Sequence, residues 1–214
     1  MKIKVNRDEA LRYLGYKGGQ IHEDVIRALS DCMAELEEIA RARYIYKVLN
    51  IDEVNFQGND IAKHLDGCNK CILMAATVGM EVDELIKRRQ MKDMTAAVML
   101  DACGSSAVEN ACNQVETMLR AQFSEKGMFV TGRFSPGYGD MPLSQQKELC
   151  YLLDVQRSIG IYNTDSNTLI PSKSVTAVMG ISNKPLGKTC AGEATKSSCD
   201  LCNFSGKCNF RKEG

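Results

Sequence analysis

The sequence lacks the features that mark several large classes of protein. Its 27 Lys and Arg residues are balanced by 27 Asp and Glu residues, so no net basic charge is available to attract nucleic acid or anionic lipid. No apolar run approaches the roughly 20 residues that cross a bilayer. Residues 1–7 also lack the apolar segment of a signal peptide. We therefore expect a cytoplasmic protein without nucleic-acid or membrane partners.

Two kinds of catalytic site are disfavoured as well. The chain has 2 histidines, His22 and His64, which lie far apart in sequence, so neither a histidine-based metal centre nor a Ser-His-Asp triad is expected. No Gly-x-Gly-x-x-Gly motif follows any predicted strand. This absence argues against a Rossmann fold and against the methyltransferases that use one.

What remains is the composition of one sizeable domain, or of a domain with a small appendage. The 214 residues are 44% apolar and 25% charged, which is typical of a globular protein with a true core. Helical periodicity predicts helices over residues 23–42, 60–65, 82–89 and 93–123, and one that opens at Pro142 and Ser144. Apolar and β-branched runs predict strands over residues 43–49, 71–78, 128–131 and 168–181. Because these elements show no regular βαβ alternation, we predict an α+β domain with an antiparallel or mixed twisted sheet and flanking helices.

The predicted helix over residues 93–123 contains a run of small residues at 102–107. A glycine costs a helix about 1 kcal/mol relative to alanine, so Gly104 indicates close approach of either another backbone or a ligand. We favour the first interpretation, tight packing on the sheet. Glu109 follows this run, where it is either solvated or placed to stabilise a positive charge.

The segment over residues 133–142 carries the most chemical information. Its Pro-Gly pair sets a tight turn, which presents backbone N–H and C=O groups to the polar edge of a ligand. Arg133, just before the turn, supplies a planar, permanently charged donor suited to a carboxylate. Tyr138, just after it, offers a ring face and a hydroxyl. The alternative is a surface turn with a solvated Arg133 and a packed Tyr138, and the residues alone leave both interpretations open.

The same segment begins a longer resemblance to a known family. The motif Arg-x-x-Pro-Gly-Tyr at residues 133–138 is followed in order by Pro142, Gln145-Gln146, Leu152-Leu153, Gly160, Pro171 and Ser174-Val175-Thr176. This ordered set resembles the activation domain of cobalamin-dependent methionine synthase, in which Arg-x-Ala-Pro-Gly-Tyr precedes a proline, a Leu-Leu pair, a glycine and a proline before Ser-Val-Ser-Gly. The resemblance covers residues 133–180. Residues 11–16 resemble stand-alone relatives of that domain.

The resemblance implies a protein that binds S-adenosylmethionine (AdoMet) in a shallow groove beside the sheet. Such a domain sits over a corrinoid whose cobalt has become Co(II). An electron-donor protein supplies one electron, and the methyl group of AdoMet traps the resulting Co(I) as methylcobalamin, while the protein orients the cofactors. No Asp-x-His-x-x-Gly motif is present, so the cobalamin would reside on a partner, a corrinoid-binding methionine synthase or a related methyltransferase.

The resemblance implies a role for five residues in and beside the turn. Arg133 matches the family arginine that pairs with the AdoMet carboxylate. Ser135 stands where the family has an alanine whose backbone contacts the nucleoside, and Pro136 and Gly137 shape the turn. Tyr138 matches a tyrosine that faces the corrin ring.

Three residues outside the turn complete the expected AdoMet site. Ser174 and Thr176 match the Ser-Val-Ser strand that lines the groove, and Glu109 matches a glutamate near the sulfonium. The family continues that strand with Gly-Trp-Tyr, whereas this chain has Ala-Val-Met at residues 177–179.

The end of the chain differs in composition from the rest. We therefore divide the chain into an AdoMet-binding activation domain, residues 1–188, and a cysteine-rich tail, residues 189–214. The tail has few large apolar residues to pack, and four thiolates at short spacings can close around an iron–sulfur cluster or a zinc ion. The candidate ligands are Cys190, Cys199, Cys202 and Cys208. A reduced tail without metal is the alternative.

The hypothesis from sequence is therefore a stand-alone reactivation subunit of a cobalamin-dependent methyltransferase. It would bind AdoMet and dock on a separate corrinoid protein. Two rivals remain: a metal or iron–sulfur redox module that serves a corrinoid protein, and an interaction partner without turnover.

Overall fold

A computed structural model describes residues 1–16 and 18–185 of the chain. Its helices are α1 (Arg7–Tyr13), α2 (Glu23–Ile39), α3 (Asn59–His64), α4 (Met80–Gln90), α5 (Met94–Ser124), α6 (Gln146–Leu153) and α7 (Val155–Ile159). Its strands are β1 (Arg43–Asn50), β2 (Lys70–Thr77), β3 (Phe129–Val130), β4 (Tyr162–Asn163), β5 (Leu169–Ile170) and β6 (Ser174–Ser182). Two short 3₁₀ helices are η1 (Ile51–Glu53) and η2 (Leu143–Gln145).

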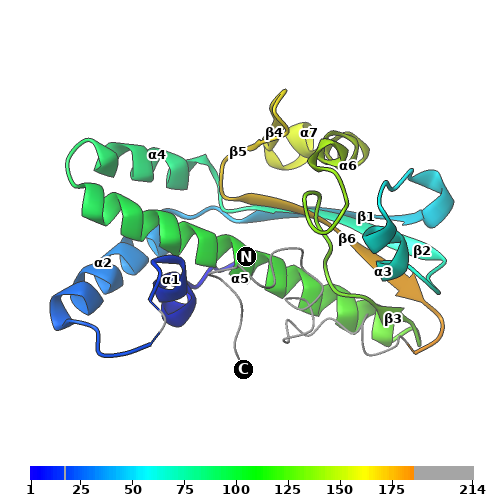
Figure 1. The fold of residues 1–214 in the computed structure, drawn as a ribbon, viewed down its shortest axis with the longest axis horizontal. Helices are drawn as coiled ribbons and strands as arrows, with labels where there is room; N and C mark the ends of the chain where they lie inside the picture. The colour runs from blue at the N-terminus through cyan, green and yellow to red at the C-terminus, as the bar shows by residue number, and fades with distance from the viewer. Residues whose placement is uncertain (17, 186–214) are drawn as a thin grey trace.

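The centre of the molecule is a four-stranded sheet in the order β1-β2-β6-β3, with every neighbouring pair antiparallel (Figure 1). Strand β2 is buried along its whole length except at Lys70, as its continuous apolar sequence predicts. Strands β4 and β5 form a separate two-stranded ribbon. The α+β fold class with an antiparallel sheet and flanking helices is therefore confirmed.

Helix α5 covers one face of this sheet (Figure 1). Alternate residues of β2 point toward it and meet residues spaced by three and four along the helix, as both periodicities require. The contacting set is Ile72, Met74, Ala76, Cys112, Val115 and Leu119. Asp93 caps the helix by accepting a hydrogen bond from the Ala96 N–H, so α5 begins where the sequence predicts.

The N-terminal half of α5 carries a second layer of helices, α1, α2 and α4. Leu29 and Leu36 of α2 are fully buried in this layer. Each buried leucine contributes about 1.5–3 kcal/mol to the free energy of unfolding. Gly104 of α5 packs closely against the side chains of Lys173, just before β6, and Val82 of α4, so its close packing is with a neighbouring helix and not with the sheet as expected.

The opposite face of the sheet is covered by α3, α6 and α7 (Figure 1). Helix α6 ends at Asp154, which has φ +49°, and α7 follows at once. The helix predicted to open near Pro142 begins as η2 and continues as α6, and the left-handed Asp154 separates it from α7 because such a residue breaks the helical hydrogen-bond ladder.

Two predicted strands are shorter than expected. The predicted strand 168–181 is divided into β5 and β6 around Pro171, which has no N–H to donate to a ladder. The predicted strand 128–131 is reduced to two residues of β3. Beyond them Thr131 uses its hydroxyl as well as its backbone to hold Gly180, accepting from the Gly180 N–H at 2.7 Å.

Among the described residues, no helix combines the length and apolar character needed to cross a membrane.

His64, at the end of α3, ties that helix to the chain after β3. Its Nε2 lies 2.8 Å from the Gly132 carbonyl oxygen and 2.9 Å from the Thr131 hydroxyl. Burial, first, and the nearby Arg120 charge lower the pKa of His64, against the opposing effect of the Gly132 bond. The folded protein therefore holds this imidazole neutral.

We predict that this histidine makes the fold acid-sensitive. The ordinary pKa of histidine is 6.5, so below this pH the imidazole binds a proton in the unfolded chain but not in the folded one. The free energy of unfolding therefore decreases as the pH falls, until the pH reaches the lowered pKa of His64 in the folded chain. Denaturant titrations at pH 7 and 5.5 should show a smaller decrease for His64→Gln than for the parent. The matched control is His22→Gln, because the His22 side chain is 77% exposed, and it should keep the parental decrease. Equal decreases in parent and His64→Gln would contradict the assignment.

Candidate functional site

Residues 135–141, hereafter the bend, form the tight turn that a Pro-Gly pair predicts. The Tyr138 N–H donates to the Ser135 carbonyl at 3.1 Å, and Gly137 has φ +89°, a conformation that favours glycine. Two further hydrogen bonds of 3.0 Å close the bend, from the Gly137 N–H to the Met141 carbonyl and from the Met141 N–H to the Tyr138 carbonyl. The bend is therefore defined by its own backbone.

The bend is also attached to the start of α3. The Asp140 carboxylate accepts hydrogen bonds from the backbone N–H groups of Asn59 at 2.7 Å and Asp60 at 2.9 Å. The Asp60 and Asn59 donors hold the pKa of Asp140 below its ordinary value. A Cβ atom on Gly139 would lie 2.5 Å from an Asp60 carboxylate oxygen, so only glycine fits there. These contacts hold the bend in place without a ligand.

Aromatic rings support the exposed side of the bend. The Tyr138 ring packs edge-on against Phe134 with centroids 6.4 Å apart, and the Phe134 ring lies 5.2 Å from that of His64. Pro136 is buried, whereas Tyr138 is 58% exposed. Tyr138 is thus a supported ring with a large accessible surface, as contact with a planar partner requires.

Arg133 stands at the entrance to the bend and reaches across to α5. Its Nε donates to the Glu116 carboxylate at 2.9 Å, and its Nη2 donates to the Asn113 carbonyl oxygen at 2.6 Å and to the Glu109 carboxylate at 3.3 Å. The Arg133 side chain is only 17% exposed. Burial alone would lower the pKa of Arg133, but the neighbouring acidic groups, Cys112 and the two glutamates, raise it. The guanidinium therefore stays charged.

A second arginine completes this group. Arg120 donates to the Glu116 carboxylate through Nε at 3.0 Å and Nη2 at 2.9 Å, and to the Thr131 carbonyl at 2.8 Å. Two arginines and two glutamates thus balance in charge. We call Glu109, Asn113, Glu116, Arg120 and Arg133 the charge cluster.

The charge cluster contains one expected pair and three residues that the sequence analysis missed. Arg133 and Glu109 lie together, although 24 residues separate them. Asn113 and Glu116 lie one and two helical turns beyond Glu109 on the same face of α5, a spacing visible in the sequence once Glu109 is chosen. Arg120 follows Glu116 by one further turn.

Ser174 and Thr176 lie on β6, and their side chains point away from α5. The Ser174 hydroxyl donates to the Thr77 hydroxyl at 2.9 Å, and the Thr176 hydroxyl is buried with no hydrogen-bond partner. The backbone groups of Thr176, unlike its side chain, face an edge of the sheet. Val178 exchanges two backbone hydrogen bonds with Phe134, and the alternation of a strand therefore turns the Thr176 N–H and C=O toward the same edge. No described strand pairs with that edge at Thr176.

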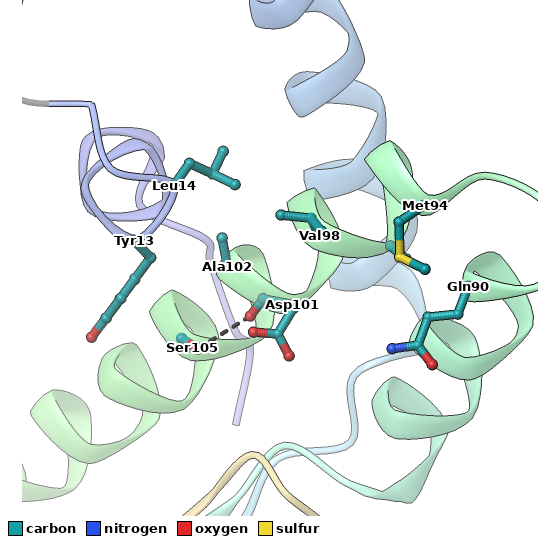
Figure 2. Close-up of a pocket in the computed structure, with 9 residues that line it drawn as sticks. Tyr13, Leu14, Gln90, Met94, Val98, Asp101, Ala102 and Ser105 are labelled. Atoms are coloured by element: carbon teal, nitrogen blue, oxygen red, sulfur yellow. Dashed lines mark hydrogen bonds between the residues drawn. The ribbon is translucent and has the colours of Figure 1, made fainter.

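A cavity of about 350 Å³ lies further along α5 (Figure 2). Tyr13 and Leu14 line it on one side, and Asp101 and Ser105 of α5 form part of its floor. Burial, and then the Glu109 carboxylate, raise the pKa of Tyr13 to about 12. Tyr13 is therefore a further residue, absent from the sequence-based site, that lines this cavity and is affected by the charge of Glu109.

The four tail cysteines lie outside the described residues. Within residues 1–16 and 18–185, no group of three or more His, Cys, Asp or Glu side chains is arranged to hold a metal ion.

Comparison with known proteins yields a match in structure. No protein-family model and no curated protein matches the sequence. Among solved structures, the crystal structure of the MetH reactivation domain bound to AdoHcy matches with a TM-score of 0.60 and 16% identity, over 83% of this chain and 70% of that one. The described chain therefore has the fold of the MetH reactivation domain.

Proposed function

We propose that this protein binds AdoMet and supports the reductive methylation of Co(II) cobalamin on a separate corrinoid protein. The observation that carries the proposal is the Arg133–Glu109 pair beside a preformed Pro-Gly bend, in the fold of a reactivation domain that was solved with AdoHcy. The ligand of that structure is the product of AdoMet after methyl transfer. The bend residues matched by the resemblance therefore stand beside a charged group suited to an amino-acid ligand.

The charges of the pair suit the amino-acid end of AdoMet. A guanidinium and a carboxylate with their nearest atoms 3.3 Å apart complement a zwitterion, whose carboxylate would take Arg133 and whose cationic groups would lie near Glu109. The amino and carboxylate groups of the ligand add one charge of each sign to the balanced charge cluster, and the sulfonium of AdoMet adds one further positive charge for Glu109 to stabilise. The backbone of Ser135 and the unpaired edge of β6 at Thr176 would meet the nucleoside, and Tyr138 would face the corrin ring.

The reaction assigned to this arrangement needs three participants besides the protein. An electron-donor protein of the cytoplasm gives one electron to Co(II) cobalamin on the partner. The Co(I) formed then takes the methyl group of AdoMet, which leaves as AdoHcy. This chain holds AdoMet in place and orients it toward the partner.

We predict that calorimetric titration will detect AdoMet binding that depends on Arg133. Arg133→Lys keeps the charge but loses the planar fork, so the dissociation constant should rise about 10-fold or more, in line with a charged hydrogen bond of roughly 1.5–3 kcal/mol. Glu109→Gln should weaken AdoMet more than AdoHcy, because AdoHcy lacks the sulfonium charge.

The matched control for Arg133 is Arg157→Lys. Arg157 lies on α7, is 85% exposed and pairs only with Asp154 among the described residues, so its variant should bind AdoMet as the parent does. Thermal melts of every variant separate loss of a contact from loss of the fold. An Arg133→Lys variant that melts and binds like the parent would refute the assigned contact.

Reactivation itself is tested by spectroscopy. We expect that a Co(II) corrinoid methyltransferase, mixed with reductant, AdoMet and this protein, will form methylcobalamin faster than without the protein. The gain should fall with Arg133→Lys and persist with Arg157→Lys. Equal rates with and without the protein would overturn the proposed function.

The tail is proposed to hold an iron–sulfur cluster or a zinc ion through Cys190, Cys199, Cys202 and Cys208. Protein purified without oxygen should contain iron with visible absorption, or zinc without it. Substitution of Cys199 by serine should lower the metal content, whereas Cys150→Ser, at a buried cysteine of α6, should not. Absence of both metals would reject this part, and reduction of Co(II) to Co(I) by the added reductant that needs the metal but not AdoMet would favour a redox module.

A further inference from the structure

Strand β1 leaves one edge of the sheet unpaired. It pairs with β2 over all eight of its residues, and no other described strand lies beyond it. Five of these residues are exposed, whereas β2 is buried at every position except Lys70. The strand contains neither proline nor glycine, and its pairing with β2 has no bulge. An edge of this length and regularity is a template for another strand.

The alternation of β1 identifies the backbone groups at this edge. The N–H groups of Arg41 and Ile51, just outside the strand, donate to the chain of β2, so odd-numbered residues bond inward. Asn50, an even-numbered residue, instead donates its N–H to the Glu53 carboxylate at 2.6 Å. The even-numbered residues before it turn their N–H and C=O groups outward: Tyr44, Tyr46 and Val48.

We propose that β1 pairs with β1 of a second copy of this chain, antiparallel and with Tyr46 opposite Tyr46. A twofold axis normal to the sheet passes beside the residue that opposes its own copy, and placing Tyr46 there pairs all three outward-facing residues with one another. In this register Tyr44 lies opposite Val48 twice. Each of the three pairs exchanges two bonds, so about six hydrogen bonds satisfy every outward-facing group.

The side chains match in the same register. Tyr44 and Val48 are each 37% exposed and lie on the α5 side of the sheet, as Tyr46 does. The Tyr44 hydroxyl is 3.6 Å from the Met118 sulfur, and that of Tyr46 is 3.4 Å from the Gln122 carbonyl oxygen, so α5 holds both rings in place. Pairing would place the ring of Tyr44 directly across from Val48, an aromatic and β-branched pair of the kind that stabilises sheets.

The charges at the two ends of the strand select the antiparallel direction. Exposed Arg41 and Arg43 stand at its start, and exposed Asp52 and Glu53 follow its end. Antiparallel pairing brings the basic start of one copy near the acidic end of the other, whereas parallel pairing would bring like charges together. Lys47 lies across from Ile45 in this register, so the two copies of Lys47 do not oppose each other directly.

The resulting dimer leaves the proposed AdoMet site free. Strand β3 and Arg133 lie at the other margin of the sheet, with β2 and β6 between them and β1. Two copies would form one continuous eight-stranded sheet with a site near each outer margin. Dimer formation and AdoMet binding are thus separable.

The test compares two substitutions at Val48 by sedimentation velocity and light scattering of the full chain. Val48→Thr keeps the outward N–H and should remain dimeric. Val48→Pro removes that N–H, which bonds nothing else among the described residues, together with the side chain that faces Tyr44, and proline is tolerated at a sheet edge. It should therefore raise the dimer dissociation constant at least 10-fold, with an unchanged circular dichroism spectrum. A parent protein that stays monomeric at high micromolar concentration, or a folded Val48→Pro dimer, would overturn the proposal.

A charge exchange provides a second test that avoids proline. Arg41→Glu should weaken the dimer, and adding Asp52→Lys should restore it, because this register places Arg41 opposite Ile51, next to Asp52, and the exchanged charges again attract across the axis. Failure of the double variant to regain affinity would refute the assigned register. If the monomeric variants bind AdoMet as the parent does, the result of the dimer test is independent of the proposed function.

Discussion

The fork of Arg133 between the bend and α5 is the contact on which the arrangement of this molecule depends. Arg133 leaves the end of the short strand β3 and reaches Glu109, Asn113 and Glu116, three residues on consecutive turns of one helix face. A buried guanidinium without such partners would be strongly destabilising. The same contact therefore ties the start of the bend to α5 and fixes the orientation of the cation without a ligand.

The charges around Arg133 determine which ligands suit the site. Two arginines and two glutamates balance within the charge cluster, so the amino-acid end of AdoMet, which adds one charge of each sign, keeps that balance, and the sulfonium brings one further positive charge that a freed carboxylate can meet. Arg133 already shares its donors with Glu116 and Asn113, so a ligand carboxylate must share the fork or replace Glu109, the longest of its contacts at 3.3 Å. Glu109 is then released toward the cationic groups of the same ligand. The pair is thus better suited to amino acids than to simple anions.

Local patterns explain which parts of this structure could be predicted from the sequence. The apolar run of β2, the periodicity of α5 and the Pro-Gly turn each depend on a few neighbouring residues, and the structure has all three. The length of β3 depends instead on where Thr131 finds Gly180, a contact across 49 residues. The resemblance implies that the strand at Thr176 lines the groove, and strand alternation, set by the pairing of β6 with β2, decides that the side chain turns inward and the backbone turns toward the edge. Non-local pairing decides such details, and no pattern in a short segment records it.

The two margins of the sheet differ in a way that α5 alone explains. At the β3 margin the helix presents charged and amide side chains between Glu109 and Arg120, which hold a bend and leave the strand short. At the β1 margin it presents Met118 and Gln122, which support two tyrosine rings and leave the strand long and regular. One helix thus carries a polar face at the β3 margin and an adjoining face that supports the tyrosines at the β1 margin. Because both faces belong to α5, this helix connects the two margins directly, alongside the central strands β2 and β6.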